Sequence, residues 1–135
     1  MVSMTDLPGT HIEVRVYIED TDAGGIVYYV NYLKYMERAR TEFMRTLGYG
    51  KAALFADDLL FVVHSLQVDY LQSAKLDDLL KVSAKVIKRG KVGLVFEQTV
   101  ERDDQVLCQA QVKIACIDRA IRKPAIIPQD LLDRL

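Results

Sequence analysis

The chain has 135 residues, the usual size of one globular domain, so we expect residues 1–135 to form a single domain. Lys and Arg total 18 and Asp and Glu total 19, so the strongly basic surface of a nucleic-acid-binding protein is excluded. No apolar run approaches the ~20 residues needed to cross a bilayer, and the first ten residues lack the pattern of a signal peptide, so we expect a cytoplasmic protein.

The N-terminal half predicts one strand and one long helix. The strand covers residues 12–18, where Ile12, Val14, Val16 and Ile18 alternate with other residues. A polar turn with two glycines follows at residues 20–25. A helix is predicted from about Val30 to Leu47, because apolar residues recur every three or four positions and Gly48 provides an end. A short helical or irregular piece is predicted at residues 51–57.

The C-terminal half predicts four further strands separated by polar turns. They are Phe61–Tyr70, Leu80–Lys88, Val92–Val100 and Val106–Cys116. We expect these four strands to form a meander that the first strand joins, giving an α+β fold with a five-stranded antiparallel sheet covered by one helix. One helix covers only part of one face, and open sheet edges favour pairing between chains, so we expect a homo-oligomer.

Neither the cysteines nor the histidines predict a metal site. Cys108 and Cys116 lie on one predicted strand, about 26 Å apart at ~3.3 Å per residue, which is too far for a disulfide. Buried reduced thiols are the expected state. His11 and His64 lie in no spacing typical of metal ligands, so no metal is expected.

The segment Asp20–Tyr32, with the sequence DTDAGGIVYYVNY, contains two carboxylates and two glycines between a strand and a helix. One interpretation is a simple turn, in which Asp20 and Thr21 hydrogen-bond to the backbone and the glycines allow positive φ. The other is an active site: the free N–H groups at the helix start would hold an oxyanion, and a carboxylate would attack an acyl carbonyl or activate water. The residues alone favour neither.

The same segment resembles the signature of the hot-dog acyl-CoA thioesterases. The resemblance rests on RVYIEDTDAGGIVY from Arg15, NY from Asn31 and YMERARTE from Tyr35, and it continues through FVV, VDY, LDDLL and LVFEQ in the predicted strands. The nearest branch is the one associated with the Tol-Pal cell-envelope system, and the 4-hydroxybenzoyl-CoA thioesterases are close relatives. The resemblance covers nearly the whole chain in order.

The resemblance implies a hot-dog fold, in which a long central helix is wrapped by the sheet and two chains form a dimer, often a dimer of dimers (a homotetramer). It implies hydrolysis of acyl-CoA to a free acid and CoA without a cofactor. The family's catalytic aspartate falls on Asp22, and its carbonyl-polarising N–H falls on Tyr29, with Gly25 and Ile26 shaping the acyl site. The Tol-Pal-associated branch usually has His where this chain has Tyr29, but a backbone N–H does not depend on that side chain.

Two further groups of charged residues have alternative interpretations. Glu37, on the long helix, is an alternative catalytic carboxylate, but an ion pair with neighbouring arginines is favoured. Arg89 and Lys91 form a basic turn where relatives commonly bind CoA phosphates, although a solubilising hairpin tip fits the residues equally well.

Three functions are weighed for the whole chain. The first is thioester hydrolysis, with acyl carrier protein as a further possible partner. The second is a non-catalytic module that binds acyl carriers or envelope proteins as a scaffold. The third is a hot-dog dehydratase or hydratase, which needs a histidine paired with a carboxylate; Tyr29 has no histidine nearby in sequence and argues against it.

Overall fold

The computed structural model describes residues 9–49 and 58–135, so the piece predicted at residues 51–57 lies outside the described residues. The elements are β1 (Gly9–Arg15), the 3-10 turn η2 (Ile18–Asp20), α1 (Val30–Thr46), β2 (Leu59–Tyr70), β3 (Leu79–Arg89), β4 (Gly93–Arg102), β5 (Gln105–Asp118) and α3 (Gln129–Leu132). In the described ranges, no helix is long and apolar enough to cross a membrane.

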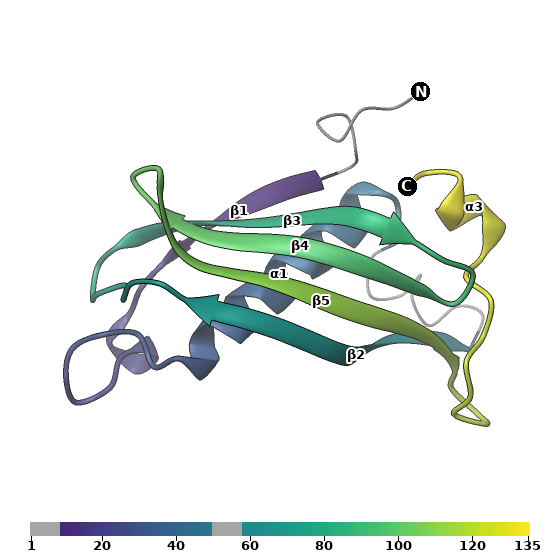
Figure 1. Ribbon diagram of the computed structural model, residues 1–135, viewed down its shortest axis with the longest axis horizontal. Coiled ribbons are helices and arrows are strands. Elements are labelled where there is room, and N and C mark those ends of the chain that lie inside the picture. The colour runs from purple at the N-terminus through teal and green to yellow at the C-terminus, as the bar shows by residue number, and fades with distance from the viewer. Residues whose placement is uncertain (1–8, 50–57) are drawn as a thin grey trace.

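The five strands form one antiparallel sheet in the order β1-β3-β4-β5-β2, and α1 lies across one face of it (Figure 1). This confirms the α+β class and the five-stranded antiparallel sheet. The predicted meander of four strands is wrong, because β2 pairs with β5 instead of β3. The connection over residues 71–78 is too long for a tight hairpin, and it carries the chain past the ends of β5 and β4 to reach β3.

The alternation in the late strands correctly predicts which side chains face the helix. The inward set on β5 is buried, and it comprises Cys108, Ala110, Val112, Ile114 and Cys116. Of the residues between them, Gln109, Gln111 and Lys113 are exposed and Ala115 is partly buried. Both cysteines are buried free thiols, as predicted, and burial raises the pKa of Cys108 to about 12, with a smaller contribution from Asp69.

Helix α1 forms where the apolar stripe predicts it and ends one residue earlier than expected. Met36, Ala39 and Phe43 are fully covered by the sheet. Gly48 has φ +86° and ends the helix in a Schellman arrangement, in which the Tyr49 N–H donates to the Met44 carbonyl (2.9 Å).

The first strand ends earlier than predicted, at Arg15, and Ile18 is 75% exposed instead of facing the core. The physical reason is a local polar turn. The Asp20 carboxylate accepts a hydrogen bond from the Tyr17 N–H (2.9 Å), and the chain turns out of the sheet into η2. This early exit places the polar segment beside the start of α1.

The inner face of the edge strand β2 is only partly covered. Its inward side chains Val63, Leu66 and Tyr70 are between 41% and 47% exposed, because α1 packs mainly on β1, β3 and β4. One edge of β2 pairs with β5, and the other edge pairs with no strand in the described part of the chain. The sheet therefore has an open apolar margin along β2.

A buried polar side chain ties the helix to the sheet. Gln98 on β4 is 0% exposed, and its Nε2 donates to the carbonyls of Met36 in α1 and Ser83 in β3 (both 2.9 Å). Its Oε1 accepts a hydrogen bond from Arg40 Nη1 (2.8 Å). Burial lowers the pKa of the Arg40 guanidinium, and the nearby Glu37 carboxylate opposes that shift.

Candidate active site

The loop between η2 and α1 is held by its own backbone. The Asp22 N–H donates to the Ile26 carbonyl (2.9 Å), and the Gly25 N–H donates to the Asp22 carbonyl (3.0 Å). Gly25 has φ +77°, a conformation that favours glycine. The tight turn considered in the sequence is therefore present, and it serves to display the side chain of Asp22.

The two aspartates of this loop have different surroundings. Asp20 braces the loop: its carbonyl accepts hydrogen bonds from the Tyr28 N–H (3.0 Å) and Asn31 Nδ2 (2.8 Å). Its carboxylate is bound to the Tyr17 N–H. The Asp22 carboxylate is exposed, accepts one hydrogen bond from the Gly24 N–H (2.8 Å), and faces a pocket of about 240 Å³. Of the two carboxylates, that of Asp22 is the one free to meet a ligand.

The start of α1 lies in the same pocket. Tyr29 is the N-cap residue, with helical φ −56° and ψ −30°, and its side chain makes no capping hydrogen bond with the described residues. Its N–H has no hydrogen-bond partner among the described residues. Such N–H groups at a helix start carry a partial positive charge and attract a developing oxyanion. The structure thus brings Asp22, Ile26 and Tyr29 together in one pocket, with Gly25 in the adjoining turn.

The opposite wall of the pocket comes from the end of β2 and the connection to β3. It consists of Tyr70, Leu71, Gln72 and Ser73. Two short backbone contacts hold this connection against the Asp22 loop: the Val27 N–H donates to the Ala74 carbonyl (2.9 Å), and Ile26 forms a bridge with Lys75. The sequence interpretation missed this wall, because in the sequence its only signal was a turn at Asp77 and Asp78.

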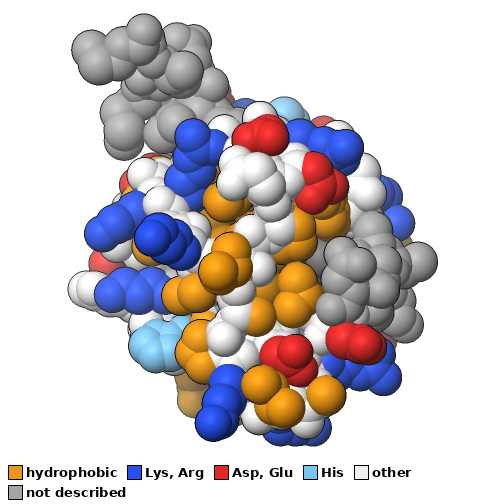
Figure 2. Space-filling view, turned by 90° about the vertical axis from the view of Figure 1, so that its right-hand side faces the viewer, with side chains coloured by type: hydrophobic (Ala, Val, Ile, Leu, Met, Phe, Trp, Pro, Cys, Tyr) orange, Lys and Arg blue, Asp and Glu red, His pale blue; other side chains and the backbone are white. Residues whose placement is uncertain are grey.

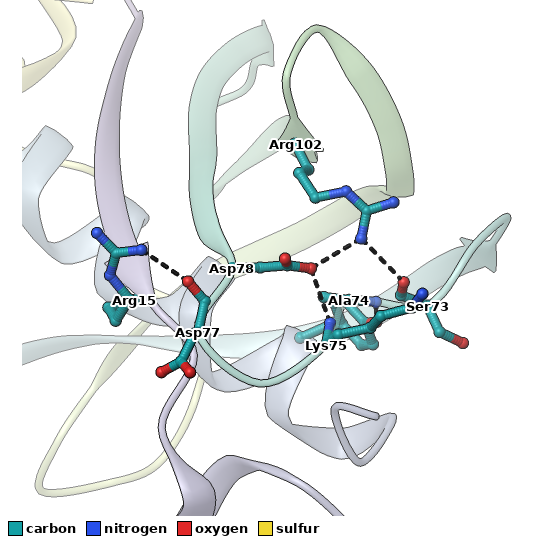
Figure 3. Close-up of polar contacts among 8 residues, drawn as sticks. Arg15, Ser73, Ala74, Lys75, Asp77, Asp78 and Arg102 are labelled. Atoms are coloured by element: carbon teal, nitrogen blue, oxygen red, sulfur yellow. Dashed lines mark hydrogen bonds and ion pairs between the residues drawn. The ribbon is translucent and has the colours of Figure 1, made fainter. Parts of the chain in front are cut away.

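Two arginines fix the connection over residues 71–78 from outside the pocket (Figure 3). Arg102 donates to Asp78 Oδ2 (2.7 Å) and reaches the Ser73 carbonyl (3.4 Å), and Arg15 donates to the Asp77 carbonyl (2.6 Å). Burial by itself raises the pKa of the Asp78 carboxyl, but the hydrogen bonds from Arg102 and the Lys75 N–H outweigh it and hold that pKa below its usual range. The wall is thus anchored to β1 and β4.

The tyrosines around the pocket divide into buried and half-exposed members. Tyr32 and Tyr35 are buried, whereas Tyr28 and Tyr29 are about half exposed. The Tyr32 hydroxyl accepts a hydrogen bond from the Ala74 N–H (2.9 Å), which joins α1 to the pocket wall. The Tyr29 and Tyr70 rings meet edge to face, with centroids 5.9 Å apart.

The basic turn predicted to bind CoA lies far from this pocket. Arg89 is the last residue of β3 and Lys91 follows it, whereas the connection that lines the Asp22 pocket leads into the first residue of β3. The two ends of β3 lie at opposite ends of the molecule (Figure 1). Arg89 Nη1 donates to the carbonyls of Leu132 and Leu135, and it shares a polar pocket with Lys91 beside α3. On this end of the molecule, an apolar band is bordered on one side by Lys and Arg side chains (Figure 2). One chain does not bring Arg89 and Lys91 to Asp22.

The other candidate groups also lie away from the pocket. Glu37 is exposed and lines pockets farther along α1, beside Arg40, instead of the pocket that contains Asp22. His11 and His64 are exposed strand residues. Within residues 9–49 and 58–135, no group of three or more His, Cys, Asp or Glu side chains is placed to hold a metal ion.

Comparison with known proteins defines the class. The model of the thioesterase-like superfamily matches residues 16–135. The chain is 45% identical over 124 residues to acyl-CoA thioesterase YbgC of Haemophilus influenzae, covering 91% of each chain. It is 39% identical over 120 residues to acyl-CoA thioester hydrolase YbgC of Escherichia coli O6:H1, covering 88% of this chain and 90% of that one.

The solved structures agree with the sequence relatives. A probable thioesterase from Bartonella henselae superposes with a TM-score of 0.84 at 31% identity, over 89% of this chain and 99% of the other. The helix on a five-stranded antiparallel sheet is therefore the hot-dog fold of the thioesterases, as expected. The chain belongs to the thioesterase-like superfamily and is a thioesterase by class.

Proposed function

We propose that the protein hydrolyses acyl-CoA thioesters to a free carboxylic acid and CoA at the pocket between Asp22 and Tyr29. One observation carries the proposal: the Asp22 carboxylate and the start of α1 line the same pocket, and the Tyr29 N–H has no partner among the described residues. The relatives named as acyl-CoA thioesterases support the substrate class.

The reaction needs an acceptor for the oxyanion and a group that delivers the nucleophile. The thioester carbonyl oxygen would accept a hydrogen bond from the Tyr29 N–H, where the helix start stabilises the negative charge of the tetrahedral state. Asp22 would act in one of two ways. As a nucleophile, it forms a mixed anhydride, expels the CoA thiolate and is released by water. As a general base, it takes a proton from the water that attacks the carbonyl.

The experiment that tests this function is thiol release from a panel of short-chain, long-chain and aromatic acyl-CoA substrates. Turnover of at least one substrate, with kcat well above the rate constant of uncatalysed hydrolysis, is the expected result. If no member of the panel releases thiol, the second function weighed from the sequence, a non-catalytic scaffold that binds acyl carriers or envelope proteins, replaces hydrolysis.

A homodimer through the free edge of β2 is part of the proposal, with a dimer of dimers as the larger assembly. The unpaired edge and the half-exposed side chains Val63 and Leu66 support it, because pairing two β2 strands would satisfy the edge and cover the apolar margin. Light scattering should give two or four times the 15.3 kDa chain mass. A single-chain mass at micromolar concentration would contradict the dimer.

The same pairing gives the basic turn a role at the site. Strand β3 has 11 residues, and its first residue, Leu79, lies at the end of the sheet near Asp22. Leu79 and Arg89 are therefore roughly 33 Å apart, ten steps at ~3.3 Å per residue. If two β2 edges pair antiparallel, the two chains run in opposite directions along the joint. The basic turn of each chain then lies at the same end of the dimer as Asp22 of the other chain. We therefore assign Arg89 and Lys91 to the CoA phosphates of the thioester bound by the neighbouring chain.

Two finer points complete the proposal. An acyl carrier protein presents the same thioester atoms on the same pantetheine arm, so it is a candidate second substrate. The proposed location is the cytoplasm, beside the Tol-Pal system with which the most similar family branch is associated. Free thiols such as Cys108 and Cys116 are usual in that reducing compartment.

A further inference from the structure

The start of α1 is poorly supported on the side of β2. The helix packs mainly on β1, β3 and β4, and the inner face of β2 remains half exposed beside it. The side chain of the N-cap residue, Tyr29, makes no capping hydrogen bond to the first turn of α1 within the described part of the chain. The contacts of Val27 and Tyr32 with Ala74 hold the neighbouring residues to the segment that follows β2. Relative to β2 itself, the position of Tyr29 depends on the side chains that cross the gap between the two elements.

Tyr70, the last residue of β2, crosses this gap. Its hydroxyl donates to the Tyr29 carbonyl oxygen (3.2 Å), and its ring packs edge to face on Tyr29 and Tyr32, with centroids 5.9 and 5.6 Å away. In the described residues, no other β2 side chain hydrogen-bonds to Tyr29 or to α1. Within residues 9–49 and 58–135, Tyr70 thus provides the side-chain hydrogen bond between β2 and the point where the helix begins.

We infer that Tyr70 is a positioning residue for the thioesterase reaction. Its hydroxyl binds the carbonyl of Tyr29, and the N–H of the same residue donates to the thioester oxygen. The inference rests on the proposed function. A hydrogen bond to the carbonyl restricts rotation of the residue that carries it. A displacement of about 1 Å between the N–H donor and the reacting oxygen can lower the rate by up to about 10²-fold. The hydroxyl remains a donor in the assay range, because burial and the neighbouring Cys108, Tyr29 and Tyr32 raise its pKa.

The contribution of Tyr70 is confined to the bound transition state. The substrate binds with its carbonyl near the Tyr29 N–H in either case, but the oxyanion needs the donor held in place as charge develops. Removing only the hydroxyl should therefore lower kcat and leave KM nearly unchanged. A purely structural role would instead lower the melting temperature or the folded fraction.

The test is Tyr70→Phe in the full chain, which keeps both ring contacts and removes one hydroxyl. We expect kcat for the best acyl-CoA to fall about fivefold to tenfold, with KM within twofold and an unchanged melting temperature. Tyr49→Phe is the matched control: it also removes a hydroxyl hydrogen bond, to Asp130, beyond the other end of α1, and kcat should stay within twofold.

Three results would overturn the inference for Tyr70. They are a kcat of Tyr70→Phe within twofold of the unsubstituted protein, a loss confined to KM, and a loss matched by Tyr49→Phe. These outcomes are distinct from failure of the proposed function, in which the unsubstituted protein itself releases no thiol from any acyl-CoA.

Discussion

Asp22→Asn is expected to lower kcat by about 10²–10⁴-fold, the range for losing a general base, and by at least as much if the carboxylate is the nucleophile. The fold should survive, because the one hydrogen bond that Asp22 accepts, from the Gly24 N–H, can also be accepted by the amide oxygen of Asn. The loss is therefore chemical. The measurement is kcat and KM on the best acyl-CoA, with the melting temperature recorded for each variant.

Glu37→Gln is the matched control for Asp22→Asn. It also neutralises an exposed carboxylate near α1, but Glu37 lies outside the pocket that contains Asp22 and Tyr29. Its kcat should stay within twofold of the unsubstituted protein. If Asp22→Asn kept near-full activity and Glu37→Gln lost it, the active site would lie along α1 instead, beside Arg40.

Gln98→Leu is expected to lower the free energy of unfolding by about 3 kcal/mol. Leucine preserves much of the volume, so the loss comes from the three hydrogen bonds that Gln98 no longer makes. The carbonyls of Met36 and Ser83 lose a donor, and the partly buried Arg40 guanidinium loses its acceptor. Urea unfolding measures the change.

The control for Gln98 lies on the neighbouring strand, on the opposite face of the sheet. Gln111→Leu changes the same residue type at an exposed position of β5, so its free energy of unfolding should change by no more than about 0.5 kcal/mol. If the two variants unfolded at the same urea concentration, the hydrogen bonds of Gln98 would make no net contribution to stability.

The sequence predicts the elements of this fold well because their signals are local. The apolar stripe of α1 and the alternation of β5 each lie within one segment, and both agree with the observed burial. The neighbour of β2 is not a local property. Pairing with β5 depends on where the connection over residues 71–78 leads, and turn residues such as Asp77 and Asp78 suggest a hairpin to the next strand.

The candidate site likewise has one half that is local in the sequence and one half that is not. The half formed by Asp22 and Tyr29 lies within ten residues of sequence, where the motif is visible. The other half, from Tyr70 to Ser73, lies some forty residues later, and only the folded sheet brings it to Asp22. The choice between Asp20 and Asp22 came from family resemblance. The structure distinguishes the two side chains in that Asp22 is exposed and lines the pocket, whereas Asp20 is partly buried and does not line it.

The loop that carries Asp22 should tolerate changes in some of its side chains. Its shape depends on main-chain hydrogen bonds, such as those of Asp22 to Ile26 and of Val27 to Ala74, and not on the side chains of Tyr28 or Tyr29. Those side chains can therefore be exchanged without dismantling the loop. A different side chain at position 29 would therefore change the shape of the pocket that Tyr29 lines, while the main-chain hydrogen bonds that place Asp22 beside the start of α1 are kept.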